Sequence, residues 1–210
     1  MTSTKRSLTL TVLALSFLFT FTQASADLMT YDGMGLHASV KIRAHGTLAD
    51  GKTIDAGQNR IGYGGEDFLA YCVDLNHYTG SGQVAELPYT VLPNAWAVAY
   101  VFETYADSVA TGTQAAALQA AIWELIAETD KHFDVTAGHF RISNNSAVEA
   151  AATDILAGLP GAYTPQTTIT VLASQCKQDM LINAGPEVPE PTSLALMALG
   201  GALLIRRRLR

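Results

Sequence analysis

The sequence predicts an α+β fold, in which an antiparallel β-sheet or sandwich carries a helical insertion. Three observations support this prediction. Residues Leu36–His45 and Thr167–Ala173 alternate between apolar and polar side chains, as strands do when one face is buried. The chain between residues 94 and 160 instead places its apolar residues at helical spacing. Strands followed by helices and then by strands favour an antiparallel sheet over a parallel, doubly wound one.

The first predicted strand, Leu36–His45, alternates without a break and is expected to lie half-buried in the sheet. Asp50 and Gly51 follow it and predict a two-residue hairpin turn, because a left-handed backbone suits this pair. The glycine-rich stretch 62–65 precedes a strand and has no lysine after it. It is therefore interpreted as a turn and not as a phosphate-binding loop.

A second strand is predicted over Phe68–Leu75 and carries Cys72. Because side chains alternate along a strand, Cys72 shares a face with Asp74 and, beyond the strand, with Asn76. His77 has the opposite parity if the strand stays regular. We therefore do not assign His77 as a base for Cys72.

Three helices are predicted in the middle of the chain. Asn94 is expected to cap the first, Thr113 the second, which runs to Glu128, and Ser146 the third, where it forms a capping box with Glu149. The second helix has one apolar stripe, made of Ala115, Gln119, Ile122, Trp123 and Ile126. An uncharged amide in such a stripe needs a specific role.

The strand and the second helix together resemble a known family. A Tyr-Cys-Val strand around Cys72, followed by a helix with Gln119-Ala-Ala-Ile-Trp123, resembles the Cys-Gln thioester domains of bacterial surface proteins. In those domains the cysteine sulfur and the glutamine side-chain carbonyl join in an internal thioester. The family commonly has Thr before the glutamine, where this chain has Leu118. Gln114 does follow a threonine but lacks the Ile-Trp, so Gln119 is the matching residue.

This resemblance implies a function in covalent adhesion. Cys72 and Gln119 would form the thioester, and Trp123 would shield it from water. An amine on an unidentified surface or matrix partner would then attack the stored acyl group. Such a domain reacts once and does not turn over as an enzyme does. No cofactor is predicted.

The N-terminal residues 1–26 are typical of a secretory signal peptide. Lys5 and Arg6 precede the apolar run Leu8–Phe21, and a small-residue cleavage site ends at Ala26. A transmembrane anchor is the alternative, but the run is shorter than the roughly 20 residues that span a bilayer.

A second sorting signal is predicted at the C-terminus. Its motif consists of Val188, Pro189, Glu190 and Pro191. The apolar run Ser193–Ile205 and an arginine cluster at 206–210 come next. This order resembles the PEP-CTERM signal of Gram-negative bacteria, which implies processing by an exosortase. It also implies a transient stay in the inner membrane, with the arginines on the cytoplasmic side, followed by release to the cell surface or matrix.

These signals divide the chain into a predicted domain at 27–182, a linker at 183–191, and a hydrophobic sorting helix with a basic tail at 192–210. The segment from Asp27 to Pro191 holds all nineteen acidic residues but only seven of the thirteen basic ones, a net charge of −12. Such a body is not suited to nucleic acid or anionic lipid. No metal-ligand spacing is present among His37, His45, His77, His132 and His139.

One alternative for Cys72 remains open from the residues alone. An exported chain with two cysteines commonly joins them, and a Cys72–Cys176 disulfide would close a loop of about a hundred residues. The protein would then be a structural or exopolysaccharide-associated surface domain without covalent chemistry. The thioester and the disulfide make opposite demands on Cys176.

Overall fold

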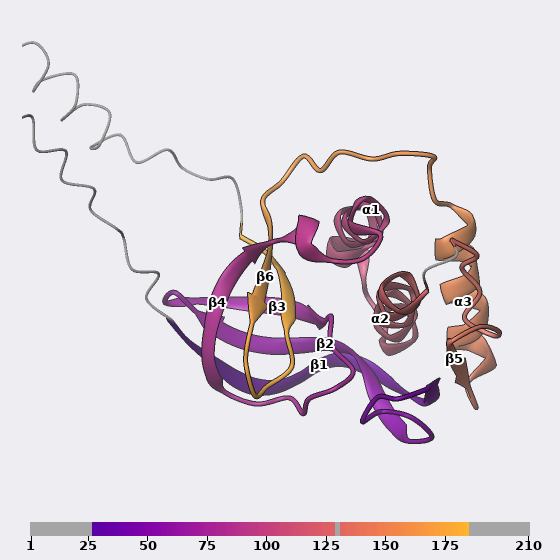
Figure 1. Cartoon of the computed structure of the whole chain (residues 1–210), viewed down its shortest axis with the longest axis horizontal. Helices are drawn as coiled ribbons and strands as arrows, with labels where there is room; N and C mark the ends of the chain where they lie inside the picture. The colour runs from indigo at the N-terminus through magenta and orange to yellow at the C-terminus, as the bar shows by residue number, and fades with distance from the viewer. Residues whose placement is uncertain (1–26, 129–130, 185–210) are drawn as a thin grey trace, which may run out of the picture.

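The computed structural model describes residues 27–128 and 131–184 (Figure 1). The predicted signal peptide, the PEP motif and the sorting segment lie outside these residues. The strands are β1 (Asp27–Ala44), β2 (Thr53–Tyr63), β3 (Glu66–Cys72), β4 (Gly82–Pro88), β5 (Phe140–Ser143), β6 (Ile169–Ala173) and β7 (Met180–Asn183). The helices are α1 (Ala95–Tyr105), α2 (Gly112–Ala127) and α3 (Ser146–Ala157), with short 3-10 turns at Tyr89–Val91 and Ala106–Ser108.

The strands form one antiparallel sheet in the order β2-β3-β7-β6-β4-β1-β5. The long strand β1 also pairs with β2, so six strands close into a ring and β5 extends it beside the end of β1. The helices are inserted between β4 and β6. The α+β prediction of an antiparallel sheet with a helical insertion is confirmed. The first and last described residues lie at the same end of the fold (Figure 1).

Helix α2 lies at the centre of the molecule. It packs against β1 and β2 on one side and against α1 and α3 on others (Figure 1). Every residue from Ala115 to Leu125 is buried, including the glutamine and a glutamate. The predicted apolar stripe is therefore only part of a helix that is enclosed on all faces. Among the described residues, no helix combines the length and apolar character needed to cross a membrane.

Two predicted helix caps are wrong by one or two residues. Thr111, not Thr113, caps α2, and it forms a capping box with Gln114. Asn145 caps α3, because its side chain accepts from the backbone N–H of Val148. These residues precede the predicted ones and leave the chain extended enough to accept the bond.

Asn94 does stand at the start of α1, as predicted, but its side chain has a different task. It takes a left-handed backbone conformation and makes no cap bond to its own helix. Its amide nitrogen instead donates to the carbonyls of Leu125 and Glu128, at 2.8 and 2.9 Å. It therefore satisfies the C-terminal carbonyls of α2 and joins the two helices.

The connection between β1 and β2 is longer than the predicted two-residue turn. Residues 45–52 separate the strands, and Gly51 has a φ of 74°. Asp50 accepts a hydrogen bond from the backbone N–H of Ala44, which closes the turn. Lys52 lies at the end of this turn, and its side chain reaches the pocket described below.

Candidate functional site

The structure brings Cys72 and Gln119 into direct contact. The backbone N–H of Cys72 donates to Gln119 Oε1 at 2.9 Å, and Gln119 Nε2 donates to the carbonyl of Cys72 at 2.8 Å. The amide thus pairs with the end of β3 as a neighbouring strand would. Gln119 is 1% exposed, so both bonds are shielded from water. This pairing explains why an amide stands inside the buried helix α2.

The Cys72 sulfur lies in the same buried region. Its thiol donates to the carbonyl of Asp74 at 2.7 Å, and the Asp74 N–H points back at the sulfur at 3.3 Å. Burial raises the pKa of the thiol to about 12, although the Asp74 backbone and the Trp123 indole N–H lower it in part. Among the described residues, the Trp123 indole N–H has no acceptor in full hydrogen-bond geometry. Its effect on the pKa of the Cys72 thiol is therefore weak. Cys72 is therefore a protonated thiol at neutral pH.

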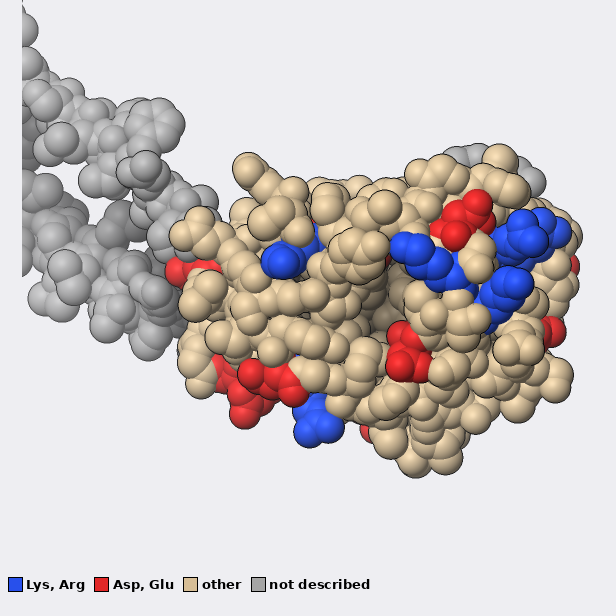
Figure 2. Space-filling model, turned by 90° about the horizontal axis from the view of Figure 1, so that it is seen from below, with Lys and Arg blue, Asp and Glu red and all other residues tan. Residues whose placement is uncertain are grey.

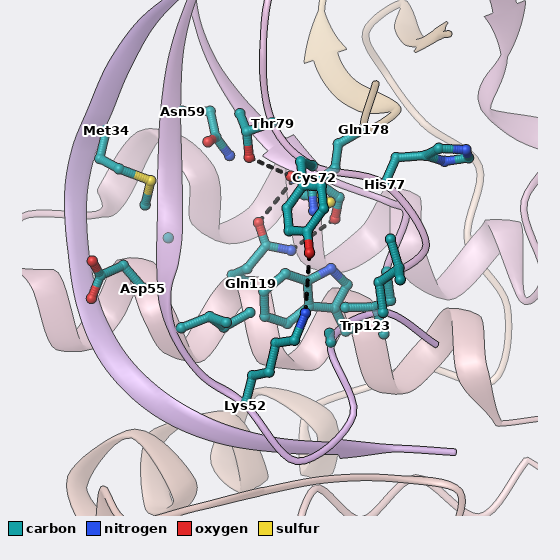
Figure 3. Close-up of a pocket in the computed structure, with 16 residues that line it drawn as sticks. Met34, Lys52, Asp55, Asn59, Cys72, His77, Thr79, Gln119, Trp123 and Gln178 are labelled. Carbon is teal, nitrogen blue, oxygen red and sulfur yellow. Dashed lines mark hydrogen bonds between the residues drawn. The ribbon is translucent and has the colours of Figure 1, made fainter. Parts of the chain in front are cut away.

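Cys72 and Gln119 border a pocket of about 150 Å³. Trp123, which is 2% exposed and packs against Phe140 at 6.1 Å between ring centroids, forms one wall. Figure 3 shows Cys72, Gln119 and Trp123 gathered at the centre of this space. Figure 2 shows a face that is hollowed near its middle, with a basic and an acidic group on the two sides of the hollow. The pocket lining likewise includes Lys52 and Asp55.

The loop after β3 contacts the Cys72 sulfur through the backbone of Asp74 and is fastened by Gln178. Gln178 Nε2 donates to the carbonyl of Asp74 at 3.2 Å, and the Thr79 hydroxyl donates to Gln178 Oε1 at 2.6 Å. The backbone N–H of Gln178 donates to the carbonyl of Tyr78. The turn between β6 and β7, which bears Gln178, therefore holds this loop in place beside Cys72.

Lys52 and Tyr78 meet at the edge of the pocket. Lys52 Nζ donates to the Tyr78 hydroxyl at 3.3 Å and lies 5.3 Å from the centroid of that ring. The pair joins the β1–β2 turn to the loop after β3. Sequence reasoning did not identify Lys52, Tyr78 or Gln178, because their positions depend on turns and loops whose shapes show no local sequence pattern.

His77 lines the pocket but does not face the sulfur. Its Nδ1 lies 2.5 Å from Asp74 Oδ2, and Figure 3 shows its ring turned away from Cys72. His77 is therefore turned away from Cys72 as expected, but strand parity is not the reason, because β3 ends at Cys72 and not at the predicted Leu75. Asp74 holds the ring at the rim of the site.

Both cysteines are free thiols in the structure. Cys72 is buried, whereas Cys176 is exposed in the turn between β6 and β7. The Cys72 sulfur is directed to the Asp74 carbonyl, so the geometry gives no support to a Cys72–Cys176 disulfide. Within residues 27–128 and 131–184, no group of three or more His, Cys, Asp and Glu side chains is placed to hold a metal ion.

Comparisons with known proteins identify the C-terminal signal. Residues 187–209 match the PEP-CTERM protein-sorting motif. The predicted sorting signal is thereby confirmed, and the motif implies export, exosortase processing, C-terminal membrane anchoring and a surface or extracellular location in a Gram-negative bacterium. No curated protein is significantly similar to the chain in sequence.

One solved structure is similar to part of this chain. It is the N-terminal domain of the Streptococcus pyogenes pilus tip adhesin Cpa, with 13% sequence identity and a TM-score of 0.42. The similarity covers 70% of this chain and 93% of that domain. The two are distant in both sequence and structure.

Proposed function

We propose that this exported surface protein attaches covalently to an amine-bearing partner through a thioester between Cys72 and Gln119. The observation that carries the proposal is the pair of hydrogen bonds between the Gln119 amide and the Cys72 backbone. They hold the side-chain carbonyl next to the residue whose sulfur would attack it. The sorting motif supports a role outside the cell, where such attachment is useful.

The same hydrogen bonds favour the chemistry of thioester formation. When the sulfur attacks the Gln119 carbonyl carbon, negative charge develops on Oε1, and the Cys72 N–H already points at this oxygen from 2.9 Å. A C–S bond forms, the C–N bond breaks, and the thiol proton leaves with the nitrogen as ammonia. No oxidant is needed. The Cys72 thiol must first break its hydrogen bond to the Asp74 carbonyl. This bond therefore opposes the first step of the reaction.

The pocket supports the storage and use of the bond. Trp123 and the loop fastened by Gln178 limit the access of water to Cys72. An amine that enters the pocket attacks the thioester carbon, forms an amide with Gln119 and returns the thiol to Cys72. The reaction is used once, so the protein acts as an adhesive attachment device and not as an enzyme.

The test is the intact mass of freshly purified protein before and after methylamine. We expect a loss of one ammonia relative to the sequence, and then a gain of one methylamine at Gln119. Cys72→Ala abolishes both changes, because it removes the attacking sulfur. Cys176→Ala is the matched control and changes neither, because Cys176 is exposed and outside the pocket.

A structural role is the second candidate, since the two hydrogen bonds alone explain a buried Gln119. In that case the mass equals that of the unmodified sequence, and methylamine adds nothing to the wild-type protein. That result would overturn the thioester and leave the Gln119 amide as a non-covalent link between β3 and α2.

A further inference from the structure

We propose that Lys52 is an internal acceptor for the Gln119 acyl group, so that an unused thioester is converted to a Lys52–Gln119 amide within the same molecule. This inference rests on the proposed thioester. When the domain meets no partner, the molecule cross-links its own β1–β2 turn to α2. Lys52 is thereby a site of covalent modification.

The first support is the position of the amine. Among the described residues, Lys52 is the one lysine in the lining of the pocket that Cys72 and Gln119 share. In Figure 3 its side chain extends from the β1–β2 turn toward the centre of the pocket. The backbone of Lys52 is fixed, because its N–H donates to the carbonyl of Ala49 and its carbonyl accepts from Ile42. The approach of the amine to Gln119 is therefore a movement of the side chain.

The second support is how weakly the amine is held. No carboxylate of the described residues lies within ion-pairing distance of Lys52, and its polar partner is the Tyr78 hydroxyl at 3.3 Å. Tyr78 is 67% exposed, so water competes for this bond. An amine confined to the pocket competes with free amines at a high effective concentration once it leaves the tyrosine.

The step balances without a further reactant. The neutral Lys52 nitrogen attacks the thioester carbon, a C–N bond forms and the C–S bond breaks. The electron pair leaves on the Cys72 sulfur, which takes up the proton that the nitrogen loses. The protein stays lighter by the one ammonia that thioester formation released, but its Cys72 thiol is free and methylamine has no acyl group to attack.

The experiment follows purified wild-type protein, Lys52→Arg and Lys177→Arg during storage. Arginine keeps the positive charge but is not a nucleophile at neutral pH, and Lys177 is a matched lysine outside the pocket. At each time the intact mass, the methylamine-reactive fraction and the alkylation of Cys72 under brief denaturation are measured. A peptide map locates any branched peptide.

We expect the methylamine-reactive fraction of the wild type and of Lys177→Arg to decay several times faster than that of Lys52→Arg. The decay leaves the mass unchanged, frees Cys72 and yields a peptide that joins Lys52 to Gln119. Tyr78→Phe hastens it, because the lysine loses its hydroxyl partner. Equal decay in all variants, with uptake of one water, would overturn the Lys52 assignment and keep the thioester. Absence of ammonia loss at every time would overturn both.

Discussion

Replacement of Gln119 by alanine is expected to destabilise the protein more than replacement of Cys72 by alanine. Both hydrogen bonds of the Gln119 amide go to the backbone of residue 72 and not to its sulfur. Gln119→Ala leaves a buried N–H and a buried carbonyl without partners, which costs about 2–5 kcal/mol together. Cys72→Ala keeps both bonds and loses one small buried group and its contact to the Asp74 carbonyl, about 1–2 kcal/mol.

Urea unfolding of the two variants at neutral pH measures this difference. Neither variant can form the thioester cross-link. Its contribution to the free energy of unfolding therefore cancels when the two variants are compared with each other, whereas it would not cancel in a comparison with the wild type. The expected gap of about 2 kcal/mol corresponds to a melting temperature roughly 5 °C lower for Gln119→Ala. Gln83→Ala, at an exposed position of β4, is the control and changes stability little. Equal destabilisation by Gln119→Ala and Cys72→Ala would refute the reasoning.

Three further predictions follow from other contacts. Asn94→Gly retains the left-handed backbone but loses both bonds to the end of α2, so urea unfolding should show a loss of about 1–2 kcal/mol; an unchanged midpoint contradicts this role. Burial opposes ionisation of Glu103, but its bonds from Thr167, Tyr163 and Gln166 outweigh this and lower its pKa. Its contribution to stability is therefore present above its ordinary pKa of 4.5 and lost as the pH falls through the lowered value. Glu103→Gln should weaken the protein at neutral pH and flatten the acid side of a stability curve, whereas a parallel curve contradicts the assignment. After methylamine treatment, iodoacetamide at neutral pH should alkylate exposed Cys176 at least about 100-fold faster than Cys72, by peptide mass, because burial keeps the Cys72 thiol protonated. Equal rates would contradict that burial.

The strands at Leu36–His45 and Thr167–Ala173 and the order of elements could be predicted because local patterns encode them, although β6 is buried at every residue from Ile169 to Leu172 and not on one face only. β1 contains nearly all of the alternating segment Leu36–His45 and begins well before it, at Asp27. β7, only four residues long and buried at three of them, shows no alternation and was not predicted. Its place between β3 and β6 is set by pairing across the sheet, which a single sequence does not display.

The contact at the centre of the candidate site was expected, whereas the residues at its rim were not. A glutamine in an apolar helix is a local signal, but its pairing with Cys72 was expected only from the resemblance to thioester domains; the structure places the two residues in contact. The rim comes from turns whose shapes depend on tertiary hydrogen bonds, as those of Gln178 show. The burial of Glu124 could not be predicted for a related reason. A charged residue on a helix is normally exposed, but Glu124 is buried and accepts a hydrogen bond from the backbone N–H of Asp134.

The position of β7 between β3 and β6 determines how a pulling force on the C-terminal end would be transmitted through the sheet. The chain leaves the described fold at residue 184, directly after β7, and continues toward the sorting motif. Cys72 pairs with Met180 of this strand, so a short route leads from Gln119 through β3 to the tethered end. Because β6 and β3 flank β7 on its two sides, a pull along the strand loads both ladders at once. Tension between the partner proposed above and the membrane tether would thus strain a few paired residues of β3, β7 and β6.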